Sequence, residues 1–236
     1  MRLVRRHRIV GLEEARATYR RALEARRPTL VCANHLTMVD SAFLHHAFAS
    51  VADYLTDFRR FSWNVPAVEN FTTNAALRAI VYLGKCIPID RSGDAAHHKQ
   101  VLDTIKELVS HGEVVTLFPE GGRSRTGRVE PANVTYGVGQ ILRDLGQGSG
   151  GSPDVARGSG QSPDGRPQVL CAYLRGERQD TWSNMPERGD TMHLRVELLE
   201  PVTQERGLRA SRDLAQQVIA KLKAMEDAFF AARARS

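Results

Sequence analysis

The sequence has few cysteines and no long apolar run. Its three cysteines are widely separated and form no CxxC pair, and an odd, sparse set argues against a disulfide scaffold and for a reducing compartment. Every apolar stretch is shorter than the roughly 18 residues that a membrane-spanning helix needs. The basic N-terminus also lacks the continuous apolar segment of a signal peptide. These absences predict a cytoplasmic protein that touches the membrane face peripherally without crossing it.

Positive charge is concentrated at the N-terminus. The chain carries a formal net charge of +6, and residues 1–27 contain nine arginines against three glutamates, so the remainder is neutral. We therefore expect a basic arm and helix over 1–28, ahead of one domain over 29–236. Such an arm suits an anionic membrane surface, at about 1 kcal/mol per basic residue near the surface. A solvated helix flank is the plain alternative.

Nucleic acid is a poor match as a partner. A basic arm can bind it nonspecifically, but the body is neutral and carries no nucleic-acid-binding motif. A binding module built on the arm should lose its function when residues 1–10 are deleted. An enzyme recruited by the arm should lose only its membrane contact. We expect no nucleic-acid partner.

Apolar periodicity alternates between strand and helix patterns along the chain. This order predicts an α/β fold, with a single domain and a largely parallel central sheet flanked by helices. Strands are expected at 29–33, 86–90, 113–118, 167–174 and 193–201. Helices are expected at 11–27, 41–50, 74–84, 98–112, 134–145 and in the C-terminal segment around Leu214–Phe229.

One segment interrupts the alternation. Residues 146–167 are rich in Gly, Ser and Pro and nearly free of large apolar side chains. Such a composition cannot bury enough surface to order itself. We expect a mobile insertion within the domain.

The stretch TLVCANHLTMVD places a histidine and an aspartate at a junction between strand and helix. His35 ends the predicted strand, and Asp40 is expected to cap the following helix. The turn lets the carboxylate reach one imidazole nitrogen, which leaves the other as a base. No nucleophile lies nearby in the sequence, so the substrate would supply an alcohol or amine. The alternative is an ordinary capping aspartate beside a surface histidine.

A second stretch, FPEGGRSR, follows another predicted strand. Its paired glycines let the backbone approach a ligand, and its arginines suit a phosphate group. It is no Walker A loop, because GxxxxGK[ST] is absent, and a basic turn is the alternative. The candidate binding residues are Glu120, Gly121, Gly122 and Arg123, together with Arg91 just past the strand predicted at 86–90.

These stretches, in this order, resemble the glycerophospholipid acyltransferase family, the type that acylates lysophosphatidic acid. NHLTMVD matches its His-x4-Asp block, GKCIPIDR its second block and FPEGGRSR its third, while VLCAYL takes the place of the fourth. The resemblance implies a glycerol-3-phosphate acyltransferase-like fold. It also implies that an acyl chain is transferred from acyl-CoA or acyl carrier protein to a lysophospholipid hydroxyl, with 1-acyl-glycerol-3-phosphate as the best match.

The resemblance further implies roles for individual residues. His35 would deprotonate the acceptor hydroxyl while Asp40 orients the imidazole, and no acyl-enzyme would form. Glu120, Gly121 and Arg123 would bind the acceptor, with Arg123 and Arg91 on its phosphate. No metal or other cofactor is implied beyond the acyl donor.

Three departures from the family pattern bear on the shape of the pocket. Residues 36–39 lack bulky aromatics, Gly122 replaces a common threonine, and Ala172 replaces a usual proline. The acceptor could therefore be another lysophospholipid or an amino-lipid. Acyl chain length and the choice between CoA and carrier-protein donors also stay open.

Two other enzyme classes compete with this interpretation. A thioesterase-type hydrolase would use the same His–Asp pair, although water needs no phosphate-binding arginines. A metalloenzyme would draw on His45, His46, His97 and His98, but no HExxH or similar spacing occurs. Trp63 and Trp182 fall in unassigned segments and are interpreted as packing residues, with an interfacial anchor as the alternative.

Overall fold

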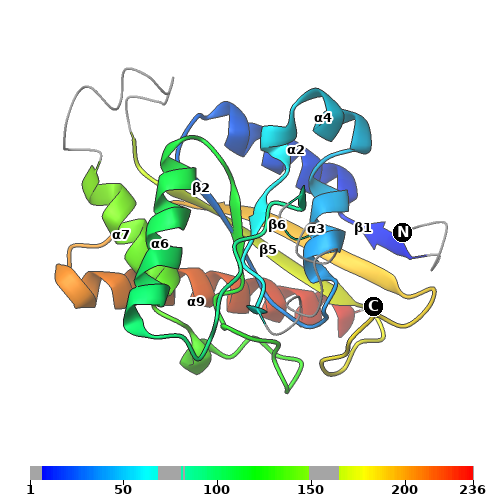
Figure 1. The fold of residues 1–236 in the computed structure, drawn as a ribbon. Coiled ribbons are helices and arrows are strands. Elements are labelled where there is room, and N and C mark those ends of the chain that lie inside the picture. The colour runs from blue at the N-terminus through cyan, green and yellow to red at the C-terminus, as the bar shows by residue number, and fades with distance from the viewer. Residues whose placement is uncertain (1–6, 69–80, 82, 149–164, 236) are drawn as a thin grey trace.

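The computed structural model describes residues 7–68, 81, 83–148 and 165–235 and has one central sheet (Figure 1). The sheet has six strands in the order β1-β6-β5-β2-β4-β3. All neighbouring strands run parallel except β5 and β6. The α/β class with a largely parallel sheet is therefore confirmed. The strands are β1 (Arg8–Val10), β2 (Thr29–Ala33), β3 (Trp63–Asn64), β4 (Val115–Leu117), β5 (Gln168–Gly176) and β6 (Thr191–Leu199).

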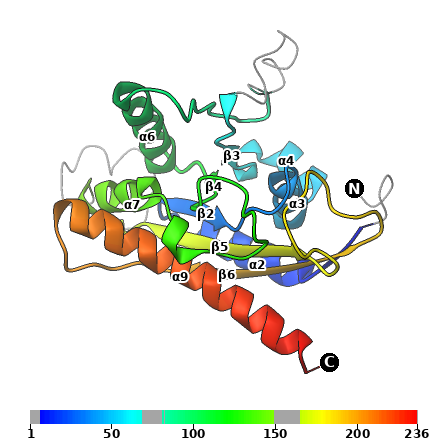
Figure 2. The same ribbon diagram turned by 90° about the horizontal axis from the view of Figure 1, so that it is seen from below.

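Helices cover both faces of this sheet (Figure 2). The α-helices are α2 (Leu12–Glu24), α3 (Asp40–Phe48), α4 (Val51–Thr56), α6 (Ala95–Ser110), α7 (Gly137–Gly148) and α9 (Gly207–Arg233). Two short 3-10 helices are η1 (Phe58–Arg60) and η3 (Pro131–Asn133).

Strand β2 shows how the apolar sequence divides between the two faces. Successive side chains of a strand point to opposite sides, so a strand buried on both faces is apolar throughout. Leu30 and Cys32 pack into the core beneath α6, α7 and α9. Val31 and Ala33 pack into the core beneath α2 and α3. The apolar run TLVCA is therefore the centre of a three-layered domain.

A glycine explains why α7 and α9 cross closely. A Cβ atom built on Gly139 would lie 1.8 Å from the Ser211 carbonyl oxygen, closer than any real contact. Gly139, in the first turn of α7, thus serves the packing of α7 on α9, which offsets its low helix propensity.

Several sequence expectations need correction. Residues 86–90 form no regular strand, since they make only two isolated bridges, from Cys86 to Asn64 of β3 and from Ile89 to Ala67. Residues 8–10, placed in the basic arm, form β1 on the edge of the sheet. The helix expected at 134–145 begins at Gly137 and ends at Gly148, so it includes the first residues of the expected insertion.

Two expectations fall mainly outside the described residues. They are the helix at 74–84 and most of the insertion at 146–167. Within the part of the chain that the structure describes, no helix combines the length and apolarity needed to cross a membrane.

Candidate active site

The sheet brings the two predicted motifs together at the ends of neighbouring strands. β2 and β4 are adjacent and parallel, with Cys32 opposite Leu117, so the residues after each strand meet at the same edge. Asn34 marks the end of β2. Its side-chain amide donates to the carbonyl oxygen of Leu174 at 3.0 Å, and its oxygen accepts from the Leu174 N–H at 2.8 Å. These two side-chain bonds tie Asn34 to β5, and the backbone turns away from the sheet at the next residue, His35.

His35 and Asp40 form a hydrogen-bonded pair across this turn. The Nδ1 atom of His35 lies 3.0 Å from Oδ2 of Asp40. The same oxygen accepts from the backbone N–H groups of Leu36, at 2.7 Å, and Thr37, at 2.8 Å. The Thr37 hydroxyl donates to the other oxygen, Oδ1, at 2.5 Å. Four donors therefore hold one carboxylate that is only 2% exposed.

The hydrogen bond fixes which imidazole nitrogen can act as a base. A carboxylate only accepts, so Nδ1 carries the proton, and Nε2 of the neutral ring keeps its lone pair. The His35 side chain is 17% exposed, and its ring stacks on Phe118 with centroids 4.0 Å apart. The stack fixes the plane of the ring while one edge stays accessible.

The geometry revises one detail of the sequence interpretation. Asp40 is the first residue of α3, the capping position is Val39, and no side-chain cap bond is present there. Instead of capping the helix, the Asp40 carboxylate turns back toward the preceding turn. The expected contact with His35 is present, but the carboxylate orders the turn rather than the helix.

The FPEGGRSR loop after β4 packs directly against His35. The Ser124 N–H donates to the His35 carbonyl oxygen at 2.9 Å. Within the loop, the Gly121 N–H donates to the Phe118 carbonyl oxygen at 2.9 Å. Both glycines, Gly121 and Gly122, therefore lie in a tight turn beside the histidine.

Arg123 extends from this loop toward the connection between β5 and β6. Its Nη1 atom donates to Oδ1 of Asn184 at 2.8 Å and to the Ser183 carbonyl oxygen at 3.3 Å. Its guanidinium also lies over the Trp182 ring, 4.6 Å from the centroid. Among the described residues no carboxylate pairs with Arg123. A cation held only by neutral groups is well suited to an incoming anion.

Arg91 does not join this cluster. It is exposed in the turn before α6, and no hydrogen bond or ion pair links it to another described residue. The structure thus brings together His35, Asp40 and the Glu120–Arg123 loop, while Arg91 extends freely from a neighbouring turn.

Comparison with protein families agrees with this arrangement. A family model described as Acyltransferase matches residues 8–156. The chain belongs to the acyltransferase family. This match confirms the predicted resemblance and includes the His35–Asp40 turn and the FPEGGRSR loop.

Three of the four histidines considered as metal ligands have other hydrogen-bond partners in this acyltransferase. His45 is buried and its Nε2 lies 2.9 Å from the Ser62 hydroxyl. Burial lowers its pKa to about 4. His97 and His98 both bond to the backbone of Asp90. Across the ranges that the structure describes, no three His, Cys, Asp or Glu residues gather as a metal site would require.

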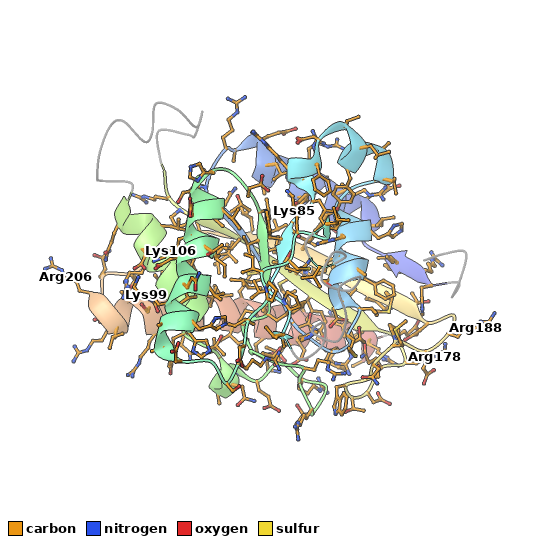
Figure 3. All side chains as sticks on the ribbon, in the orientation of Figure 1. Lys85, Lys99, Lys106, Arg178, Arg188 and Arg206 are labelled. Atoms are coloured by element: carbon orange, nitrogen blue, oxygen red, sulfur yellow. The ribbon has the colours of Figure 1, made fainter. Side chains whose placement is uncertain are left out.

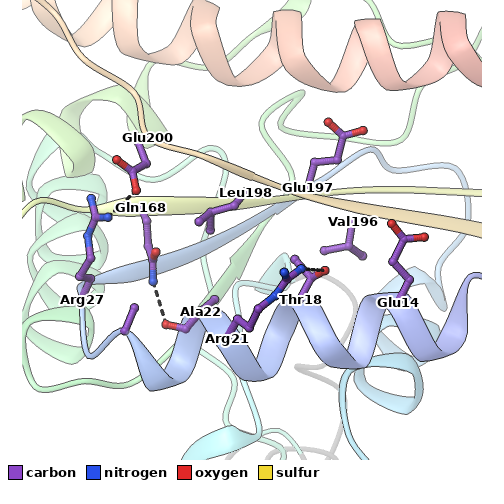
Figure 4. Close-up of a pocket in the computed structure, with 11 residues that line it drawn as sticks. Glu14, Thr18, Arg21, Ala22, Arg27, Gln168, Val196, Glu197, Leu198 and Glu200 are labelled. Carbon is purple, nitrogen blue, oxygen red and sulfur yellow. Dashed lines mark hydrogen bonds and ion pairs between the residues drawn. The ribbon is translucent and has the colours of Figure 1, made fainter.

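A hollow of about 560 Å³ lies away from the His35–Asp40 turn (Figure 4). It opens between α2 and β6, and the Arg27–Glu200 ion pair closes one end. Its lining includes Gln168, the first residue of β5. The hollow therefore lies toward the amino ends of the parallel strands, whereas His35 follows the carboxyl end of β2. It contains none of the predicted site residues.

Sequence reasoning missed several residues that shape the candidate site. Thr37 and Phe118 could have been noticed, since both lie within or beside the matched motifs. Ser183 and Asn184 carry no sequence signal, because only the folded chain brings the β5–β6 connection to the turn. Trp182, interpreted as a packing residue, is 41% exposed and stacks on Arg123.

The paired glycines allow a matched test of the loop. Gly121 has a left-handed φ of 67°, and a Cβ there would lie 2.7 Å from the Thr135 methyl group. A Cβ on Gly122 meets nothing within 4 Å. We expect Gly121→Ala to lower the free energy of unfolding by about 1–2 kcal/mol. Gly122→Ala is the control and should unfold at the wild-type denaturant midpoint. Equal losses in the two variants would contradict the assignment of strain to Gly121.

Glu120, in the loop after β4, is a half-buried carboxyl group. Burial raises its pKa to about 7, opposed by the backbone N–H groups of Glu130 and His35 and reinforced by the Glu226 and Glu130 carboxylates. Its Oε1 atom is buried without a hydrogen-bond partner. Glu120 is thus a protonatable group that touches the backbone of His35.

This raised pKa predicts a pH-dependent stability. The folded state holds the Glu120 proton more tightly than the unfolded chain, so the resulting stabilisation is complete below about pH 4.5 and is lost as the pH rises through about 7. Wild type should therefore lose stability relative to Glu120→Gln across this range. Denaturant midpoints of both proteins, measured between pH 4.5 and 8, test the prediction. A constant difference between them would contradict it.

Proposed function

We propose that this acyltransferase moves a fatty acyl group from acyl-CoA or acyl carrier protein to the hydroxyl of a lysophospholipid. The acceptor that fits best is 1-acyl-glycerol-3-phosphate, and the product is then phosphatidic acid. One observation carries the proposal: the His35–Asp40 pair, closed at 3.0 Å, adjoins a guanidinium with no carboxylate partner among the described residues. A base beside an anion-binding cation suits an alcohol that bears a phosphate.

The chemistry follows from the free Nε2 atom. His35 removes the proton of the acceptor hydroxyl, and the oxygen attacks the carbonyl carbon of the thioester. Asp40 stabilises the imidazolium that forms. When the tetrahedral intermediate collapses, the carbon–sulfur bond breaks and the leaving thiolate takes the proton from Nε2. The cycle restores neutral His35 and requires neither an acyl-enzyme nor a further cofactor.

The acceptor is held by the loop after β4. Arg123 binds its phosphate, and Glu120, Gly121 and Gly122 form the adjoining wall. Arg91, exposed in the turn before α6, supplies a second phosphate contact. Its open position allows the side chain to approach a bound headgroup.

A lipid acceptor requires access to a membrane. We assign this contact to the basic N-terminal arm, because anionic lipids of the cytoplasmic leaflet attract clustered arginines. The enzyme then acts peripherally at the cytoplasmic face.

A thiol-release assay tests the proposed function. The protein is mixed with palmitoyl-CoA or palmitoyl-acyl carrier protein, with and without 1-acyl-glycerol-3-phosphate. We expect release only with the acceptor, and one phosphatidic acid per thiol. Equal release without the acceptor would assign the protein to the thioesterase class instead.

A further inference from the structure

The connection between β5 and β6, residues 177–190, packs across the catalytic turn. The Ser183 N–H donates to the Leu36 carbonyl oxygen at 3.0 Å, and the Met38 N–H donates to the Asn184 carbonyl oxygen at 3.3 Å. These bonds accompany a parallel bridge between Thr37 and Ser183. The connection lies beyond residue 156, where the family match ends. A segment outside the matched motifs is thus fixed against the residues next to His35.

The same segment holds the guanidinium of Arg123 through one of its nitrogen atoms, Nη1. Its Nη1 atom donates to the side-chain oxygen of Asn184 at 2.8 Å, and the Trp182 ring covers one face of the group. Its Nε and Nη2 atoms have no partner among the described residues. This arrangement anchors one nitrogen and leaves the opposite edge, with its parallel N–H groups, for an anion.

We propose that Asn184 is a positioning residue that aims Arg123 at the phosphate of the acceptor. The β5–β6 connection thereby becomes part of the acceptor site. This inference rests on the proposed function, because it assumes that the anion belongs to the acyl acceptor. A long arginine side chain loses rotamer freedom on binding, and a guanidinium already fixed by Asn184 loses less. Asn184 therefore contributes to acceptor selection without touching the reacting atoms.

The neutrality of Asn184 is part of the proposal. An amide oxygen orients the guanidinium without neutralising its charge, so the phosphate remains its strongest partner. An aspartate at this position would supply a competing carboxylate. Asn184→Ala removes the shorter of the two hydrogen bonds that orient the guanidinium and leaves the 3.3 Å bond to the Ser183 carbonyl oxygen. Asn184→Asp keeps a side-chain oxygen but adds a competing carboxylate.

Arg188 provides a matched control in the same connection. It is exposed, two residues before the end of the connection, and lies near Arg178 (Figure 3). Arg188→Ala removes a positive charge from the connection without altering any contact of Arg123. A general effect of charge or of disturbing the connection would therefore appear in Arg188→Ala as well.

Two measurements on the full-length protein decide the proposal. Calorimetry reports the binding of glycerol 3-phosphate, and kinetics compare 1-acyl-glycerol-3-phosphate with the neutral 1-acylglycerol. We expect Asn184→Ala to weaken glycerol 3-phosphate binding and to reduce the preference for the phosphate-bearing acceptor, each by about 5–20-fold. The change should appear in KM rather than kcat. Asn184→Asp should lose more of this affinity and preference than Asn184→Ala. Arg188→Ala should match wild type in both.

The outcomes separate this inference from the proposed function. Wild-type affinity and acceptor preference in both Asn184 variants would overturn the role of Asn184, while acyl transfer itself would stand. A wild-type protein that binds no glycerol 3-phosphate would also overturn it. Thiol release without any acceptor would refute the proposed function, and the binding comparison would then decide the role of Asn184. Thermal melting of each variant shows whether its fold is intact.

Discussion

His35→Ala should lower the rate of acyl transfer by about 10²–10⁴-fold, the usual contribution of a positioned acid–base group. The loss should appear in kcat, because the variant removes the imidazole whose Nε2 atom is proposed to deprotonate the incoming hydroxyl. Thiol release in the presence of 1-acyl-glycerol-3-phosphate measures the effect.

The fold should survive this substitution. His35 is partly exposed, and its side chain makes one hydrogen bond and one ring stack, so the cost to stability should be about 1 kcal/mol. His111→Ala is the control, since this exposed histidine bonds only within the end of α6, to the Glu107 carbonyl oxygen. If His35→Ala kept wild-type turnover while folded, the proton would have to be removed by another group.

Asp40 variants should separate the charge of the carboxylate from its structural role. In Asp40→Asn, the amide oxygen can still accept from His35, Leu36 and Thr37 in the place of Oδ2. The amide nitrogen then faces the Thr37 hydroxyl, which can reverse and accept. We expect near-wild-type stability but a transfer rate lower by about 10²-fold, because a neutral amide does not stabilise the imidazolium and charge-assisted hydrogen bonds are roughly twice as strong.

Asp40→Ala should instead damage the fold. It leaves two buried backbone N–H groups without an acceptor, and each costs about 1–3 kcal/mol. Denaturant unfolding and turnover, measured on both variants, give the separation. Thr37→Val serves as the control, because it removes the partner of Oδ1 and the long bond from the Val39 N–H, at 3.3 Å, but keeps every contact of Oδ2. Wild-type turnover in Asp40→Asn would show that the charge of Asp40 contributes nothing to catalysis.

The sequence predicted those elements whose apolar pattern can be recognised within a single short segment. The strand Thr29–Ala33 has the predicted bounds because a run buried on both faces is apolar at every position. The C-terminal helix was equally clear, since its apolar stripe repeats over many turns. The His35–Asp40 contact also follows from a short spacing and a strand end.

The expectations that failed depend on distant partners. β1 and β3 have three and two residues, too few to show a period. The segment 86–90 has the apolar character of a strand but gains only isolated bridges, because its neighbour β3 is too short to pair along its length. Asn184 reaches Arg123 across 61 positions of sequence, and no local pattern encodes such a contact.

The edge strand β1 has a consequence for how this protein can be shortened. His7 is buried, with its Nδ1 atom 3.2 Å from the Asp190 carbonyl oxygen, and Arg8–Val10 cover the first residues of β6. Removing residues 1–10 would therefore uncover the edge of β6, and an open strand edge is a template for intermolecular pairing and aggregation. Removing only residues 1–6 would leave β1 in place and that edge covered. If the protein without residues 1–10 precipitates, the cause would be the exposed edge of the sheet rather than the loss of a membrane anchor.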